Sequence, residues 1–508
     1  MMKKKIKQVL ALTVVTAVVL GAFISDSVTA FAMGGDSTDQ PIVLRVCNWE
    51  EYIDEGDWED DEVIDLDSGD IFGENSLVED FEDWYLETYG RKVEVEYSCF
   101  GTNEELYNML TIGDEYDLVC PSDYMIMKLM SEDWLEPFSQ NFFDEEDENN
   151  YYVKGVSPYI RDVFDENEIN GESWSKYAAG YMWGVTGIIY NPDEVSREDA
   201  STWHIFDNED VYRRITIKDN VRDSMFAAVG AVKSDKLTDP SFIADPDYQS
   251  LLMDEMNDVS EETVLAVQDY LQKAKNNLYS FETDSGKADM ITGKVVANYQ
   301  WSGDAVYAMD QAEEDDFYLE FAVPEESTNL WFDGWVMLKE GIGNDPAKKQ
   351  AAEAFVNFLS MPENAVRNMY YIGYTSVISG GDDERVYEYL EWNYAAEDDE
   401  EDVVDYPVGY FFSGDPEDED YVLTVPEEQT RRQLYAQYPT SDVIDRSAVM
   451  WYFDPDANAR INRMWINVRC FNAKNIPVPV FVVVGALLAG ILFIMIRTRL
   501  KNRDTGRQ

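Results

Sequence analysis

Aromatic residues stand beside carboxylates at four places where a predicted strand has just ended. A carboxylate can neutralise an ammonium group, and a Trp or Tyr face can cover the attached methylenes and add a cation–π attraction. The pattern therefore indicates a site for amine-bearing chains, although core aromatics beside rim acids would produce it too. The four segments are Trp49-Glu50-Glu51-Tyr52, Ser122-Asp123-Tyr124, Trp301-Ser302-Gly303-Asp304 and Trp331-Phe332-Asp333.

Other chemistries have little support in the sequence. His204 is the single histidine, and GxSxG, HExxH and P-loop patterns do not occur. The stretch Asp65–Asp70 resembles the start of a calcium loop but lacks the glycine and the terminal glutamate of an EF-hand. Two carboxylates can hydrolyse a glycosidic bond, but among 102 Asp and Glu some pair always fits. We therefore predict no enzyme activity, no metal and no cofactor.

The composition favours cationic partners. The 508 residues include 102 Asp and Glu against 39 Lys and Arg, which gives a formal charge of −63. Such a chain repels phosphate backbones, so nucleic acid is excluded as a partner, and cations such as organic amines are favoured. The 45% hydrophobic content is enough for a folded core despite the charge.

Both ends of the chain carry signals for the membrane. Residues 1–32 combine four lysines, an apolar run and small residues up to Ala32, as a cleaved signal peptide does; an uncleaved N-terminal anchor is the alternative. Residues 476–496 are free of charges and long enough for a transmembrane helix. The basic tail 497–508 predicts a cytoplasmic C-terminus and an external body.

The body begins with the alternation typical of a parallel sheet. We expect strands at 42–48, 93–99 and 116–120, with intervening helices that begin at capping boxes, Ser76 with Glu79 and Thr102 with Glu105. The acidic stretch from Asp54 to Asp70 is predicted to be too polar for the core. Ligands of such sheets bind beyond the carboxyl ends of the strands, where Trp49 and Ser122 stand. Later elements are expected at 181–190 (strand), 259–278 (helix), 295–299 (strand) and from Pro346 (helix).

Seven segments in order resemble the spermidine/putrescine-binding proteins, which are the solute receptors of polyamine ABC importers. The similarity covers about residues 42–380, with a weaker match near 438–469. The segments are VCNWEEY at Val46–Tyr52, YDLVCPSDY at Tyr116–Tyr124, YMWGVTGIIYN at Tyr181–Asn191, VRDSM at Val221–Met225, YQWSGDA at Tyr299–Ala305, WFD at Trp331–Asp333 and YIGY at Tyr371–Tyr374.

The resemblance implies an α/β fold of the bilobal, periplasmic-binding-protein-like (type II) kind, with mixed sheets and a hinge. The solute-binding region would span 41–470. Lobe 1 would comprise about 41–180 and 330–380, and lobe 2 about 187–325, with an acidic insertion at 381–437. Together with the C-terminal segment 476–496, this predicts a bilobal receptor tethered by one transmembrane helix.

The resemblance also implies the site residues. Asp223 and Asp333 would be ligand carboxylates, and Ser122 a polar contact. Glu50, Asp123 and Asp304 stand beside or at matched positions, and Glu50 replaces a small hydroxyl residue that relatives often have. The cleft aromatics would be Trp49, Tyr52, Tyr124, Trp301, Trp331 and Tyr374.

The function expected from these residues is that of a membrane-tethered receptor. It would bind putrescine or spermidine in an interlobe cleft and deliver the polyamine to an ABC transporter permease. Two alternatives remain from the residues alone. One is a receptor for another small cation or a sugar, and the other is a surface protein that binds or hydrolyses glycans.

Overall fold

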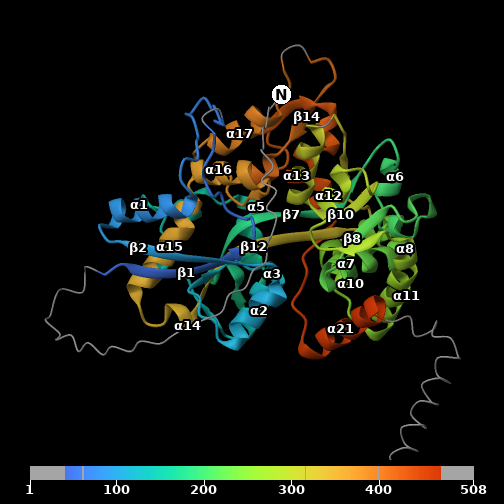
Figure 1. The fold of residues 1–508 in the computed structure, drawn as a ribbon, viewed down its shortest axis with the longest axis horizontal. Helices are drawn as coiled ribbons and strands as arrows, with labels where there is room; N and C mark the ends of the chain where they lie inside the picture. The colour runs from blue at the N-terminus through green and yellow to red at the C-terminus, as the bar shows by residue number, and fades with distance from the viewer. Residues whose placement is uncertain (1–39, 60–61, 315, 398–399, 471–508) are drawn as a thin grey trace, which may run out of the picture.

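The computed structural model describes residues 40–59, 62–314, 316–397 and 400–470. Within these residues, one mixed sheet of twelve strands runs through the molecule in the order β2-β1-β3-β12-β7-β10-β8-β9, with β4 and β16 paired to β12 and with β11 and β13 paired to β7. Its two longest strands, β7 (Ala178–Tyr190) and β12 (Thr328–Leu338), are buried along their whole length. Figure 1 shows them crossing between two halves of the molecule, which we call lobe 1 and lobe 2.

Lobe 1 is built on the parallel strands that the sequence predicts. β1 (Ile42–Trp49) pairs in parallel with β2 (Val93–Phe100) and with the short β3 (Leu118–Val119). Helix α1 (Leu77–Tyr89) begins at a complete Ser76/Glu79 capping box and ends at left-handed Gly90, as predicted. The further elements are α2 (Asn103–Ile112), α3 (Asp123–Ser131), β4 (Leu135–Glu136), α4 (Tyr151–Gly155), α5 (Pro158–Glu166), β5 (Glu168–Ile169), β6 (Glu172–Ser173), α14 (Lys339–Ile342), α15 (Pro346–Leu359), α16 (Pro362–Ile372) and β13 (Thr375–Ser376).

Lobe 2 surrounds the other end of the sheet. β10 (Ala297–Trp301) runs antiparallel to β7 and parallel to β8 (Ile215–Lys218), and β8 pairs with β9 (Ser280–Glu282). The further elements are α6 (Arg197–Ala200), α7 (Val221–Val232), α8 (Ser234–Leu237), α9 (Pro240–Ile243), α10 (Tyr248–Met256), α11 (Glu261–Asn277), α12 (Gly286–Ile291), α13 (Ser302–Glu313), β11 (Glu320–Ala322), α20 (Ser441–Asp445) and β16 (Ser447–Ala448).

The predicted lobe boundaries at 180/187 and 325/330 therefore fall in or beside the two shared strands, β7 and β12. Because each of these strands pairs with elements of both lobes, the residues that they carry stand where the lobes meet. This arrangement places the middle of β12, which contains the predicted WFD segment, at the lobe boundary.

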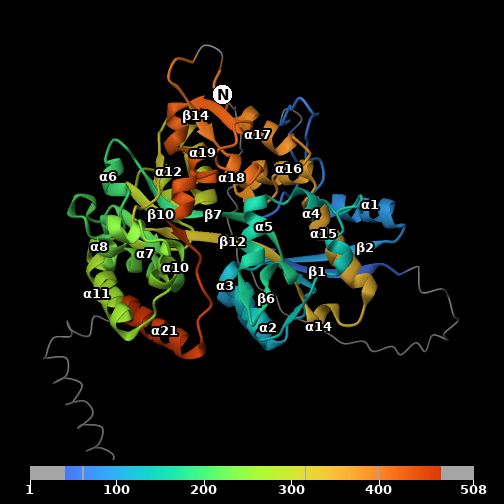
Figure 2. The same cartoon turned by 180° about the vertical axis from the view of Figure 1, so that it is seen from behind.

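The acidic insertion 381–437 folds into a cap above both lobes, in orange and red at the top of Figures 1 and 2. On lobe 1, the Ser157 hydroxyl donates to the Phe411 carbonyl at 2.5 Å, and on lobe 2, Arg431 pairs with Glu320 at 2.7 Å. The cap is thus attached to both lobes. It comprises α17 (Arg385–Tyr394), β14 (Val403–Pro407), α18 (Gly409–Phe412), β15 (Val422–Pro426) and α19 (Gln433–Gln437).

The expectation that Asp54–Asp70 is too polar for the core is wrong. Asp54 is fully buried, and Trp58, Ile64 and Leu66 are buried around it. The Asp54 carboxylate pairs with the buried guanidinium of Arg367, more than 300 residues away in the chain. A buried carboxylate is tolerated when such a partner compensates its charge.

The predicted membrane tether needs a correction. In the part of the chain that the structure describes, no helix has the length and apolar character needed to cross a bilayer. The last described helix, α21 (Pro455–Cys470), packs on lobe 2, where Lys275 donates to the carbonyls of Val468 and Arg469. Residues 476–496 and the signal segment 1–32 lie outside the described residues. The described residues therefore have the bilobal α/β fold.

Candidate ligand-binding site

Asp333 lies at an irregularity in the pairing of β12 with β7. Asp333 pairs with Met182 and Gly334 pairs with Gly180, so Tyr181 is the extra residue of a β-bulge. Bulges re-aim side chains and are frequent beside binding sites. Here the Tyr181 hydroxyl donates to the Tyr52 carbonyl at 2.7 Å and thereby holds the segment that follows β1 against the bulge.

One Asp333 oxygen is satisfied and the other is not. The Tyr52 hydroxyl donates to Oδ2 of Asp333 at 2.8 Å. Oδ1 of the same carboxylate is buried and has no hydrogen-bond partner within the described residues. A buried acceptor without a donor costs free energy unless a ligand supplies one. Asp333 is therefore a strong candidate for contact with a cationic or hydrogen-bonding ligand.

Aromatic rings surround this carboxylate. The ring centroids of Tyr52 and Tyr374 are 4.9 Å apart, and those of Trp331 and Tyr374 are 5.8 Å apart, both in edge-to-face geometry. The indole nitrogen of Trp331 is also buried without a partner among the described residues. We call Tyr52, Ser122, Trp331, Asp333 and Tyr374 the Asp333 cluster.

Burial raises the pKa of Asp333 to about 6, because the charged form loses its hydration. The hydrogen bond from the Tyr52 hydroxyl acts in the opposite direction on this pKa. Ser122 forms an isolated β-bridge with Asp333 and stands at the N-cap position of α3, where its side chain makes no capping bond. A ligand ammonium on Asp333 would favour the charged carboxylate.

Asp123, a predicted ligand contact, has two backbone partners in the structure. Its carboxylate accepts from the backbone amides of Tyr124 and Phe332, at 2.5 and 3.2 Å, and so joins α3 to β12. Burial raises the pKa of Asp123 to about 8 despite these donors. The arrangement makes Asp123 a support for the strand that carries Trp331 and Asp333.

The Tyr124 ring is already covered by a protein cation. The Arg222 guanidinium lies 4.5 Å from the Tyr124 centroid and 4.2 Å from that of Phe453. It also donates to the carbonyl of Trp451 at 2.5 Å. Because Tyr124 belongs to lobe 1 and Arg222 to lobe 2, this stack joins the two lobes.

Trp301 and Asp304 stand on the lobe 2 side with two lysines. Nζ of Lys218, at the end of β8, lies 3.9 Å from the Trp301 ring centroid. It is also 3.7 Å from Glu282 and 3.9 Å from Oδ2 of Asp304, while Lys287 lies 3.2 Å from Oδ1 of Asp304. We call Lys218, Glu282, Lys287 and Asp304 the lysine cluster.

Tyr374 connects the two clusters, since its hydroxyl donates to Oδ1 of Asp304 at 3.0 Å. Gly303 permits this close packing, because a Cβ at that position would lie only 2.3 Å from the Tyr374 ring.

Asp223, at the start of α7, is buried on the lobe 2 side of the site. Burial raises its pKa to about 6, and the charge of Lys218 opposes this increase.

The structure thus brings together most of the predicted residues but not all of them. Trp49 packs on Phe100 with centroids 4.6 Å apart, and its buried indole nitrogen lacks a partner among the described residues. Glu50 is exposed in the turn after β1, and within the described chain no contact joins it to the Asp333 cluster. The sequence reading missed Lys218, Arg222 and Lys287. Lys218 ends a strand directly before the VRDSM segment, so the strand-end rule could have found it.

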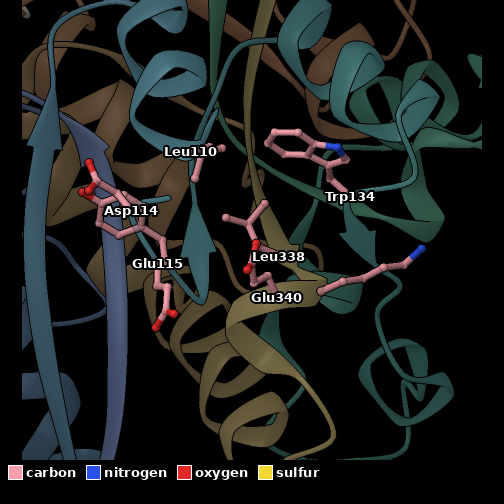
Figure 3. A pocket seen from close by; sticks show the side chains of 8 residues that line it. Leu110, Asp114, Glu115, Trp134, Leu338 and Glu340 are labelled. Carbon is pink, nitrogen blue, oxygen red and sulfur yellow. The ribbon is translucent and has the colours of Figure 1, made fainter. Parts of the chain in front are cut away.

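A separate recess on lobe 1 carries none of the predicted residues. It has a volume of about 190 Å³, and Figure 3 shows Trp134, Leu110 and Leu338 with the acids Asp114, Glu115 and Glu340 around it. It lies at the end of β12 remote from Trp331, and we assign it no part in the site.

Comparison with known proteins identifies the family. The model of the family described as bacterial extracellular solute-binding protein matches residues 76–388, which is more than half of the chain. The chain belongs to the bacterial extracellular solute-binding protein family. It is therefore a solute-binding protein of a family of extracellular receptors and not an enzyme.

Several proteins with known names are similar to this chain. The putrescine-binding periplasmic protein PotF of Escherichia coli is 24% identical over 280 residues, which cover 53% of this chain and 67% of PotF. The putrescine-binding periplasmic protein SpuD of Pseudomonas aeruginosa is 23% identical over 376 residues, which cover 72% of this chain and 82% of SpuD.

Solved structures support the fold. A spermidine/putrescine ABC transporter substrate-binding protein, PotD of Streptococcus pneumoniae, superposes with a TM-score of 0.54 at 21% identity, over 84% of this chain and 98% of PotD. A putative spermidine/putrescine ABC transporter protein from Listeria monocytogenes gives a TM-score of 0.56 at 22% identity, over 84% and 99% of the two chains. At this identity the likeness establishes the bilobal fold.

Proposed function

We propose that this solute-binding protein binds a polyamine at the lobe boundary and delivers it to an ABC transporter permease. The observation that carries the proposal is the Asp333 carboxylate, which is buried among aromatic rings with one oxygen unpartnered within the described residues. An ammonium group would satisfy that oxygen, and the faces of Trp331 and Tyr374 suit the methylenes next to it.

The relatives support the same ligand class. The named binding proteins that resemble this chain are receptors for putrescine or for spermidine and putrescine. Because the identity to these relatives is low, the amine that this chain prefers depends on the residues of its own site. Delivery to a permease is part of the proposal, and it is supported by the likeness to PotD, an ABC transporter substrate-binding protein.

Binding is also expected to favour a closed arrangement of the lobes. Tyr374 contacts Tyr52 on the lobe 1 side and Asp304 on the lobe 2 side, so a ligand beside Tyr374 would interact with both. A ligand stabilises the state in which it makes the additional contacts, which is how hinged receptors close.

The test is a calorimetric titration of the purified protein with 1,4-diaminobutane, spermidine and spermine, with glucose and thiamine as comparison ligands. We expect saturable binding of at least one of these amines and none of glucose. Binding of glucose or thiamine without binding of any aliphatic amine would contradict the proposal.

A further inference from the structure

Lys218 occupies a buried position in the lobe 2 wall. Its side chain is about 1% exposed, its Nζ donates to Oε1 of Gln300 at 2.6 Å and to the Thr283 carbonyl at 3.2 Å, and it packs on the Trp301 ring. A lysine that is buried this completely is held by its partners, because an unpaired buried ammonium would lose its charge. Lys218 is therefore a fixed cation on an aromatic ring that was predicted to face the ligand.

In the lysine cluster, two lysines neutralise part of the negative charge that a cationic ligand could otherwise contact on the lobe 2 side. Lys218 and Lys287 each lie within 4 Å of one oxygen of Asp304, and Lys218 lies 3.7 Å from Glu282. Lys287 pairs with Asp284 as well, at 2.9 Å. Two lysines of the protein itself thus compensate part of the charge of the three carboxylates near Trp301.

Two buried carboxylates of the predicted site differ from these. Asp333 has one oxygen without a partner among the described residues. Asp223 forms no ion pair within 4 Å in the described part of the chain, although the charges of Lys218 and Arg222 act on its carboxylate from further away. Both are about 6% exposed, so a cation on either would be shielded from water. Glu50, by contrast, is exposed, and an ion pair there would be weakened by solvent.

We propose that Lys218 is a specificity-determining residue that restricts the site to short diamines. In a diamine, one ammonium would meet Asp333 and the other Asp223. A third ammonium would lie against the charges of Lys218 and Lys287, where like-charge repulsion in a buried setting opposes it. This inference rests on the proposed function, because it assumes that the ligand is an amine bound between the two lobes.

The experiment compares amine selectivity in the wild type and in Lys218→Met by calorimetric titration. The wild type is expected to bind 1,4-diaminobutane at least tenfold more tightly than spermidine. Lys218→Met removes the resident ammonium but keeps the apolar stem, so it should lower that ratio at least fivefold, mainly by tightening spermidine. Lys218→Arg retains the charge and should retain the preference for the diamine.

Lys348→Met is the matched control. Lys348 pairs with the fully buried Asp117 at 2.8 Å in lobe 1, so this change also removes a lysine from a buried carboxylate. It should reduce stability without changing the ratio of diamine to triamine affinity. Because Lys218→Met leaves Glu282 less compensated, the double change Lys218→Met/Glu282→Gln is prepared as well, and it should lower the ratio in the same direction.

The outcomes separate the two proposals. A wild-type protein that binds spermidine as tightly as the diamine overturns the role of Lys218 and leaves polyamine binding intact. An unchanged ratio of diamine to triamine affinity in folded Lys218→Met, or in the double variant, also overturns the role of Lys218. A protein that binds none of the three amines overturns the proposed function itself. The wild-type ratio needs no variant to fold, so the inference stays testable in every case.

Discussion

On the lobe 1 side of the site, Asp333 keeps a buried oxygen without a partner among the described residues, whereas on the lobe 2 side both oxygens of Asp304 face lysines. Both sides have aromatic rings, and both were predicted from the same kind of segment, a tryptophan followed by an aspartate. We infer that an aromatic residue beside an acid indicates a ligand contact more strongly where the protein does not already supply the counter-charge of that acid.

Among the changes that test the difference between Asp333 and Asp304, Asp333→Asn is expected to have the largest effect. This change leaves a ligand ammonium without its buried counter-charge, and breaking such a pair costs about 3 to 5 kcal/mol, or more than about 100-fold in affinity. Titration with the best-bound amine measures the loss. Asp117→Asn is the control, because Asp117 is equally buried in lobe 1 but pairs with Lys348. Near-wild-type affinity in Asp333→Asn would contradict the assignment.

Gly303→Ala tests the contact that connects the two sides. The added methyl would lie 2.3 Å from the Tyr374 ring and would displace it. Overpacking of this kind costs about 1 to 3 kcal/mol, which denaturant unfolding can measure. Gly101→Ala is the control, because a Cβ there meets only the carboxylate end of Glu105, at 3.3 Å. Equal stability of the two variants would show that Tyr374 is not tightly held.

Tyr52→Phe tests the hydroxyl that supports Asp333. It removes the donor at 2.8 Å from Oδ2, and a hydrogen bond to a charged group is worth about 1.5 kcal/mol or more. We expect amine affinity at neutral pH to fall about tenfold, because the charged carboxylate becomes less favourable. An affinity within about twofold of the wild type would show that this hydroxyl does not support ligand binding.

The pH dependence of amine binding tests which carboxylates meet the ligand. Burial raises the pKa of Asp333 and of Asp223 to about 6 in the free protein. An ammonium ligand binds the charged carboxylate, so protonation competes with it as the pH falls below about 6. The affinity should then drop by about tenfold per pH unit for each carboxylate involved. Titrations at pH 5 and pH 7 measure this, and Asp223→Asn should reduce the dependence to that of Asp333 alone.

Local patterns in the sequence predicted much of the fold because their causes are local. The Ser76/Glu79 capping box and Gly90 define the ends of α1, and Pro346 begins α15, as expected from a few neighbouring residues. The alternation of strands and helices likewise predicted the parallel pairing of β1 with β2 and β3. The Asp333 cluster came from segments that resemble a known family, and its role in binding stays a prediction.

The sequence did not reveal the surroundings of residues whose ion-pair partners lie far away in the chain. Asp54 was expected outside the core, but Arg367 compensates its charge across more than 300 residues of sequence. The ligand contact of Asp304 stays a prediction, but the sequence did not indicate that Lys218 and Lys287 reach this carboxylate from other elements. Composition and spacing do not reveal such pairs, because they depend on how the lobes bring remote segments together.

The attachment of the cap to both lobes constrains any opening of the molecule. Residues of the cap bond to Ser157 on lobe 1 and to Glu320 on lobe 2. On the other side, Arg222 of lobe 2 stacks on Tyr124 of lobe 1. A rigid separation of the two lobes would therefore have to break at least one of these contacts.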